Sequence, residues 1–111
     1  MEVMMNLNVV VGEDSFPVNV PEDVLTEAVA LFDKMDRDMD KGWQMGRFWV
    51  EAPTVEQRCQ IVADKLLTAL SNDNPNLATM MAAYILARMP NTTAVFVATN
   101  GEIIETEFER G

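Results

Sequence analysis

Apolar residues between Leu25 and Val50 recur at steps of three and four, which is the spacing of one face of an α-helix. The stripe consists of Leu25, Ala28, Phe32, Met35, Met39, Trp43, Trp49 and Val50. Acidic residues directly after Pro21 suit the positive end of a helix dipole, so the helix is expected to begin there. The pattern predicts a long amphipathic helix that buries one side.

Two glycines, Gly42 and Gly46, fall on or beside this apolar face. A glycine costs about 1 kcal/mol relative to alanine inside a helix, so the helix either breaks near Gly42 or lets another backbone approach closely. Because the apolar stripe keeps its phase as far as Val50, we expect the helix to continue through both glycines. Pro53 ends the segment in either case.

A second helix is predicted from Thr54 to about Leu70. Thr54 and Gln57 have the spacing of a capping box, in which each side chain bonds the backbone of the other residue. Cys59 falls in the middle of the apolar face of this helix, where a thiol acts as a small apolar side chain.

A third helix is predicted to follow, with Asn74 as its cap and Pro75 in its first turn. Nearly every residue from Leu77 to Met89 is apolar. A helix that is apolar on all sides is buried on most sides. We expect it to be the central helix of the fold or the centre of a subunit interface.

Alternating residues predict a β-hairpin at each end of the chain. The first joins segments 7–11 and 16–20 through Gly12-Glu13-Asp14, and Pro17 indicates an open edge because proline donates no ladder hydrogen bond. The second joins segments 92–99 and 102–108 through Asn100-Gly101, the strongest short hairpin signal. A two-residue loop there would place three pairs on one face: Val97 with Ile104, Val95 with Thr106, and Thr93 with Phe108.

These elements predict one α+β domain over residues 1–111. The simplest assembly has two layers: an N-terminal β-hairpin, two to three helices and a C-terminal β-hairpin, with one four-stranded antiparallel sheet and the helices on one face. The terminal hairpins are expected to meet, because an isolated hairpin is marginally stable in water.

Composition excludes several classes of function. The net charge of −10 disfavours nucleic acid and anionic membranes as partners. The sequence holds no histidine, which excludes histidine-based triads and the common zinc sites, and one cysteine, which excludes an internal disulfide. The first residues, Met1 to Met5, lack the basic and apolar regions of a secretion signal, and no apolar run is long enough to span a bilayer. We therefore expect a cytoplasmic protein.

Three carboxylates, Asp33, Asp36 and Asp40, share one side of the first predicted helix. Asp36 projects nearest to the apolar stripe, so its carboxylate needs a partner. Three arginines are candidates for this role: Arg47, Arg58 and Arg88. An ion pair is the favoured interpretation, and a carboxylate cluster that holds a cation is the alternative.

The best candidate for an interaction surface consists of Trp43, Arg47, Phe48 and Trp49, because tryptophan and arginine dominate binding hot spots. In a continuous helix Trp43 and Trp49 face inward, while Phe48 and Met45 face outward. Two further apolar side chains are expected where water should be: Ile61, on the back of the second helix, and Phe96, on the outer face of the sheet.

The sequence thus predicts a non-catalytic interaction or scaffolding module that self-associates through helix faces as a dimer, with no catalytic residue and no cofactor. One alternative is a binder of a small apolar ligand or cofactor, in a pocket between helices and sheet lined by Met35, Met39 and Trp43. A third option is a carboxylate-based cation site or enzyme around the three aspartates.

Overall fold

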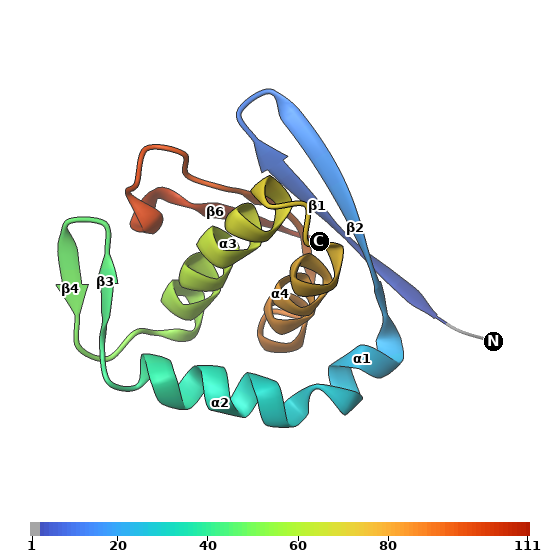
Figure 1. The fold of residues 1–111 in the computed structure, drawn as a ribbon, viewed down its shortest axis with the longest axis horizontal. Helices are drawn as coiled ribbons and strands as arrows, with labels where there is room; N and C mark the ends of the chain where they lie inside the picture. Colours follow the sequence, from blue (N-terminus) through green and yellow to red (C-terminus); the bar gives the residue numbers. More distant parts are fainter. Residues whose placement is uncertain (1–2) are drawn as a thin grey trace.

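A computed structural model describes residues 3–111 and shows an α+β fold (Figure 1). Residues 1 and 2, which belong to the N-terminal segment expected to lack a secretion signal, lie outside the described range. The elements are β1 (Met4–Val11), β2 (Asp14–Pro21), α1 (Glu22–Glu27), α2 (Val29–Met39), β3 (Trp43–Met45), β4 (Phe48–Val50), α3 (Val55–Ser71), α4 (Pro75–Arg88), β5 (Thr92–Phe96), the 3₁₀ turn η1 (Ile103–Glu105) and β6 (Glu107–Arg110). No helix within residues 3–111 is long and apolar enough to cross a membrane.

The main sheet has the strand order β2-β1-β5-β6. β1 and β2 are antiparallel and joined by a two-residue turn, since Val11 pairs with Asp14. β5 and β6 are also antiparallel, but β1 runs parallel to β5. The expectation of a purely antiparallel sheet is therefore wrong for this central pair. The physical reason is the long connection through the helices, which allows the chain to return in the same direction.

The two edges of the sheet are β2 and β6. Pro17 lies in β2 opposite Asn8 of β1, so the open edge indicated by this proline is confirmed. At the other edge, β6 is four residues long and exposes Glu107, Glu109 and Arg110.

The helices cover one face of the sheet. Figure 1 shows α3 and α4 side by side, with the sheet on one side of them and α2 crossing on the other. Buried side chains of β1, β2 and β5 form one core with those of α3 and α4. The predicted caps are confirmed: Thr54 and Gln57 form the capping box of α3, and Asn74 caps α4 with Pro75 in its first turn.

Contacts within one chain account for the apolar composition of α4, without a subunit interface. Residues 81–86 are all buried, because α3 packs on one side of this helix and the sheet on another. The prediction of a central helix is confirmed. Ile61 of α3, expected to face water, is only 1% exposed and belongs to the core.

The first predicted helix ends far earlier than expected. It comprises α1 and α2, with Ala28 between them, and stops at Met39. The continuation through the glycines is wrong: Gly42 and Gly46 have φ angles of +95° and +68°, a left-handed conformation that favours glycine. The chain instead forms the antiparallel pair β3–β4, and Gly46 opens the two-residue turn between the strands.

The C-terminal hairpin is also looser than predicted. β5 ends at Phe96, and Val95 pairs with Phe108 in place of the expected Thr106. The reason is a tertiary contact: the buried Gln60 amide of α3 donates to the carbonyl oxygens of Ile104 and Thr106, at 3.1 and 2.9 Å. These bonds hold the segment in a wider loop. Phe96 is 40% exposed on the outer face, as expected.

Candidate functional site

The β3–β4 ribbon, defined here as residues 43–50, contains all four residues predicted to form an interaction surface. Two close backbone contacts hold it. A Cβ atom on Gly42 would lie 2.5 Å from the Trp49 indole, and one on Gly46 would lie 2.8 Å from the carbonyl oxygen of Gly101. The glycines therefore allow the ribbon to close on itself and to pack against the loop before η1.

One face of the ribbon is anchored to the core. Met45 is fully buried, and Trp43 is half-buried against the core cluster. The Lys65 ammonium of α3 lies 4.8 Å from the centre of the Trp43 ring, a cation–π contact. Trp43 thus faces inward as expected, while the outward position expected for Met45 is wrong.

The remaining aromatic residues of the ribbon face solvent. Phe48 is 52% exposed and Trp49 is 58% exposed. The outward position of Phe48 is confirmed, and the inward position expected for Trp49 is wrong. The physical reason for Trp49 is the strand, in which successive side chains point to opposite faces: Trp49 pairs with the exposed Gln44, whereas Phe48 pairs with Met45 and is exposed next to the turn of the ribbon.

Arg47 lies at the turn of the ribbon with its side chain 77% exposed. Its guanidinium carbon is 5.6 Å from the centre of the Phe48 ring, and its Nε is 3.6 Å from a carboxylate oxygen of Glu102. The exposed part of the ribbon therefore presents Phe48 with the Arg47 cation on one face, beside the carboxylate of Glu102, and Trp49 on the other face. This combination is typical of contact surfaces between proteins.

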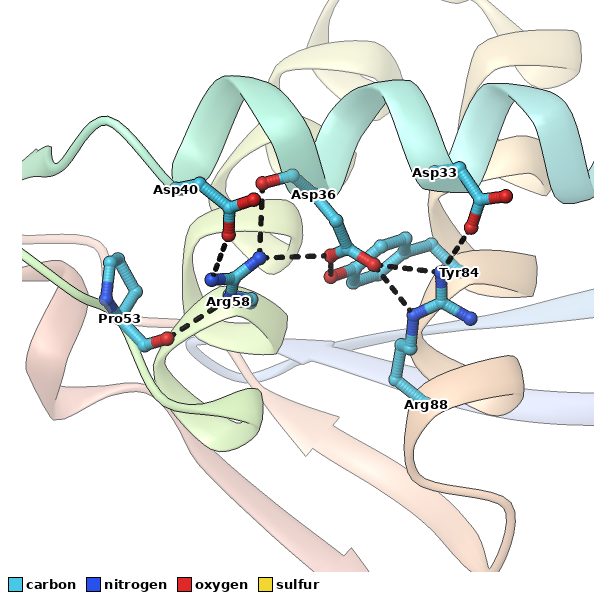
Figure 2. Close-up of polar contacts among 7 residues, drawn as sticks. All are labelled: Asp33, Asp36, Asp40, Pro53, Arg58, Tyr84 and Arg88. Carbon is cyan, nitrogen blue, oxygen red and sulfur yellow. Dashed lines mark hydrogen bonds and ion pairs between the residues drawn. The ribbon is translucent and has the colours of Figure 1, made fainter.

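A second polar feature, the Asp36 cluster, joins α2 to α3 and α4 (Figure 2). Arg88 donates from Nε and Nη2 to Asp36 Oδ2 at 3.0 and 2.7 Å. The Tyr84 hydroxyl donates to Asp36 Oδ1, and Arg58 donates to the Asp36 backbone oxygen at 3.0 Å. The prediction that Asp36 pairs with an arginine is confirmed for Arg58 and Arg88, whereas Arg47 lies at Glu102.

The other two aspartates make weaker or more exposed contacts with the same arginines. Asp40 accepts from Arg58 Nη2 at 2.5 Å, and Asp33 lies 3.5 Å from Arg88 Nη2 with its side chain 56% exposed. All three carboxylates thus face guanidinium groups. Within residues 3–111, no group of three histidine, cysteine or acidic residues could hold a metal ion.

The electrostatics of the Asp36 cluster suit a structural link better than acid–base chemistry. Burial acts to raise the pKa of Asp36, but hydrogen bonds from Tyr84 and Arg88 outweigh it and lower this pKa. Burial and the Asp36 carboxylate both raise the pKa of Tyr84. At neutral pH the carboxylate is thus a weak base and the phenol a weak acid. Cys59 is similarly inert, because burial raises the pKa of its thiol to about 12.

A groove of about 350 Å³ lies between α2, α3 and α4. Its apolar lining consists of Leu31, Met35, Leu77, Met80 and Met81. Of the three residues expected to line an apolar pocket, Met35 lines the groove, whereas Met39 is buried in the core and Trp43 belongs to the ribbon. Leu31 and Leu77 were not expected to line a pocket, although each lies four residues from a methionine of the same wall, Met35 or Met81, and forms an apolar ridge with it.

No family model, curated protein or solved structure matches this chain. Function must therefore be inferred from the ribbon, the Asp36 cluster and the groove. Of the three, the ribbon exposes the largest apolar side chains.

Proposed function

We propose that this protein is a non-catalytic interaction module that forms a homodimer through the β3–β4 ribbon. The observation that carries this proposal is the exposure of Phe48 and Trp49 on a ribbon that Gly42 and Trp43 hold in place. Aromatic side chains on a preorganised ribbon lose little conformational entropy on binding, so burying them yields more affinity than burying mobile ones. The contact surface differs from the helix faces predicted from sequence, because α4 is already covered within the chain.

Charge on the ribbon supports a second copy as the partner. A two-fold interface brings the same patch together twice, so the patch must complement itself. The ribbon meets this condition: Arg47 supplies an exposed cation, and Glu51, directly after β4, supplies an exposed carboxylate. The net charge of −10 opposes association of two copies, so the dimer is expected to tighten as salt screens this repulsion.

The first test is the native mass, measured by light scattering over a hundredfold range of protein concentration. We expect a dimer that dissociates on dilution, and at least tenfold weaker association for Trp49→Ala. Phe96→Ala is the matched control, because Phe96 is also half-exposed but lies on the outer face of the sheet. A monomer at every concentration, or equal weakening by both variants, would overturn the proposal.

A second candidate function is the binding of a small apolar ligand, and the observation in its favour is the groove lined by Leu31, Met35, Leu77, Met80 and Met81. Small-molecule sites are concave and mostly apolar with a few polar groups, as this groove is. A thermal-shift screen tests it, because a ligand that binds the folded state raises the melting temperature.

We also propose the cytoplasm as the compartment of this protein. The chain has one cysteine, and Cys59 is a buried free thiol. Such cysteine usage suits a reducing environment. Fractionation of cells that express the tagged chain tests this placement.

A further inference from the structure

We propose that the groove between α2, α3 and α4 binds a small amphiphilic cation, with its alkyl chain along the apolar walls and its ammonium group at Asp64. This inference does not rest on self-association through the ribbon. It names the ligand class for the groove, which the second candidate function leaves open.

The walls of the groove suit a flexible alkyl chain. Leu31 and Met35 lie one turn apart on α2, and Leu77 and Met81 lie one turn apart on α4. Leu31 and Leu77 are 39% and 40% exposed, so a bound chain would remove apolar surface from water on both sides. Methionine side chains, present on both walls, adapt their shape to irregular ligands.

The length of the walls favours a small molecule over a docked helix. The paired apolar residues of each wall are four positions apart, which corresponds to a rise of about 6 Å along the helix. A helix that docks in a groove places anchors over about two turns, at i, i+3 or i+4, and i+7. The volume of about 350 Å³ lies at the lower end of the range of small-molecule sites.

The preference for a cationic ligand comes from α3, which forms the polar side of the groove. This side consists of Asp64, Lys65 and Thr68. The Asp64 carboxylate is half-buried, and among residues 3–111 it joins no ion pair. The Lys65 ammonium is already placed over the Trp43 ring. Asp64 is thus the charge of the groove that lacks a partner, and the net charge of −10 further favours a cationic ligand.

Three probes with the same eight-carbon chain separate the head groups: octylammonium, octanol and octanoate. Titration calorimetry with the full chain is expected to show octylammonium binding at least tenfold more tightly than octanoate. Shortening the cation to hexylammonium removes two methylene groups and should weaken binding roughly 15-fold. Equal or tighter binding of octanoate, or no binding of octylammonium, overturns the proposal.

Two variants locate the site. Asp64→Asn is expected to weaken octylammonium at least fivefold and to leave octanol unchanged. Glu13→Gln is the matched control, because it removes the same charge from the exposed β1–β2 turn and should have no effect. Leu77→Ser shortens an exposed part of the wall and should weaken both probes in parallel. An unchanged affinity of octylammonium for the folded Asp64→Asn variant contradicts the assignment of Asp64, whatever the association state of the protein.

Discussion

Replacing Asp36 with alanine is expected to lower the free energy of unfolding by about 3 kcal/mol. The change removes the carboxylate that accepts from Tyr84 and Arg88 and lies 3.4 Å from Arg58. It leaves two guanidinium groups without this partner in a region largely shielded from water, since the side chains of Arg58 and Arg88 are 17% and 28% exposed. The link between α2 and the α3–α4 pair is therefore weakened at its centre.

The magnitude follows from the burial of the cluster. Breaking a buried pair by removal of one partner costs about 3–5 kcal/mol, whereas a solvent-exposed pair is worth about 0–1 kcal/mol. Asp36 is 26% exposed, so the expected loss lies nearer to the buried limit, at about 2–4 kcal/mol. Asp33→Ala is the matched control: its side chain is 56% exposed and makes one contact at 3.5 Å, so the expected loss is below about 1 kcal/mol.

Urea unfolding followed by far-UV circular dichroism measures both variants. Thermal unfolding is expected to agree, with a fall in the melting temperature of about 10–20 °C for Asp36→Ala. A loss below about 1 kcal/mol for Asp36→Ala, or an equal loss for Asp33→Ala, would refute the structural role of the cluster.

The same variant changes the pH dependence of stability. The pKa of Asp36 is lower in the folded protein than in the unfolded chain, so its contribution is fully present above the unfolded value of about 3.9. The contribution is lost as the pH falls through the lower, folded-state pKa. Acidification below about pH 4 is therefore expected to destabilise the parent protein more steeply than Asp36→Ala.

Three further substitutions or reactions test local features of the fold. Gly42→Ala places a Cβ atom 2.5 Å from the Trp49 ring at a φ of +95°, and should destabilise the protein by about 1–3 kcal/mol in urea unfolding. An unchanged stability would contradict the position of the ribbon. Thr54→Ala removes the hydroxyl oxygen that accepts from the backbone N–H of Gln57 and should cost about 1 kcal/mol of stability, while Thr54→Ser should retain most of this stability. Cys59 should react with a thiol reagent at pH 8 only after unfolding, because burial raises its pKa to about 12; rapid labelling of the native protein would show that the thiol is accessible.

The elements that sequence predicts well are those fixed by local contacts. The capping box of Thr54 and Gln57 and the Asn74 cap define the start of α3 and α4 within a few residues of chain. The need of Asp36 for an arginine also follows from its position beside an apolar stripe. Which arginines approach it depends on how α2 crosses the other helices, and only the structure supplies that.

The end of α2 was not predictable from the spacing of apolar residues, because apolar residues at helical steps of three and four continue into the ribbon. The helical penalty of one glycine, about 1 kcal/mol, is too small to decide between the two conformations. The decisive contacts lie further along the chain, where Gly42 meets Trp49 and Gly46 meets Gly101. The C-terminal loop shows the same limit, since Gln60 binds it from 44 and 46 residues away.

The edges of the main sheet have a consequence for the further assembly of the proposed dimer. One edge carries Pro17, which offers no N–H group to an incoming strand, and the other is short and carries Glu107 and Glu109. Both are features that discourage pairing between the strands of neighbouring molecules. Two molecules joined through the ribbon would therefore offer no sheet edge through which further molecules could add by strand pairing. Crowding should then leave discrete particles in solution, without growth into fibres.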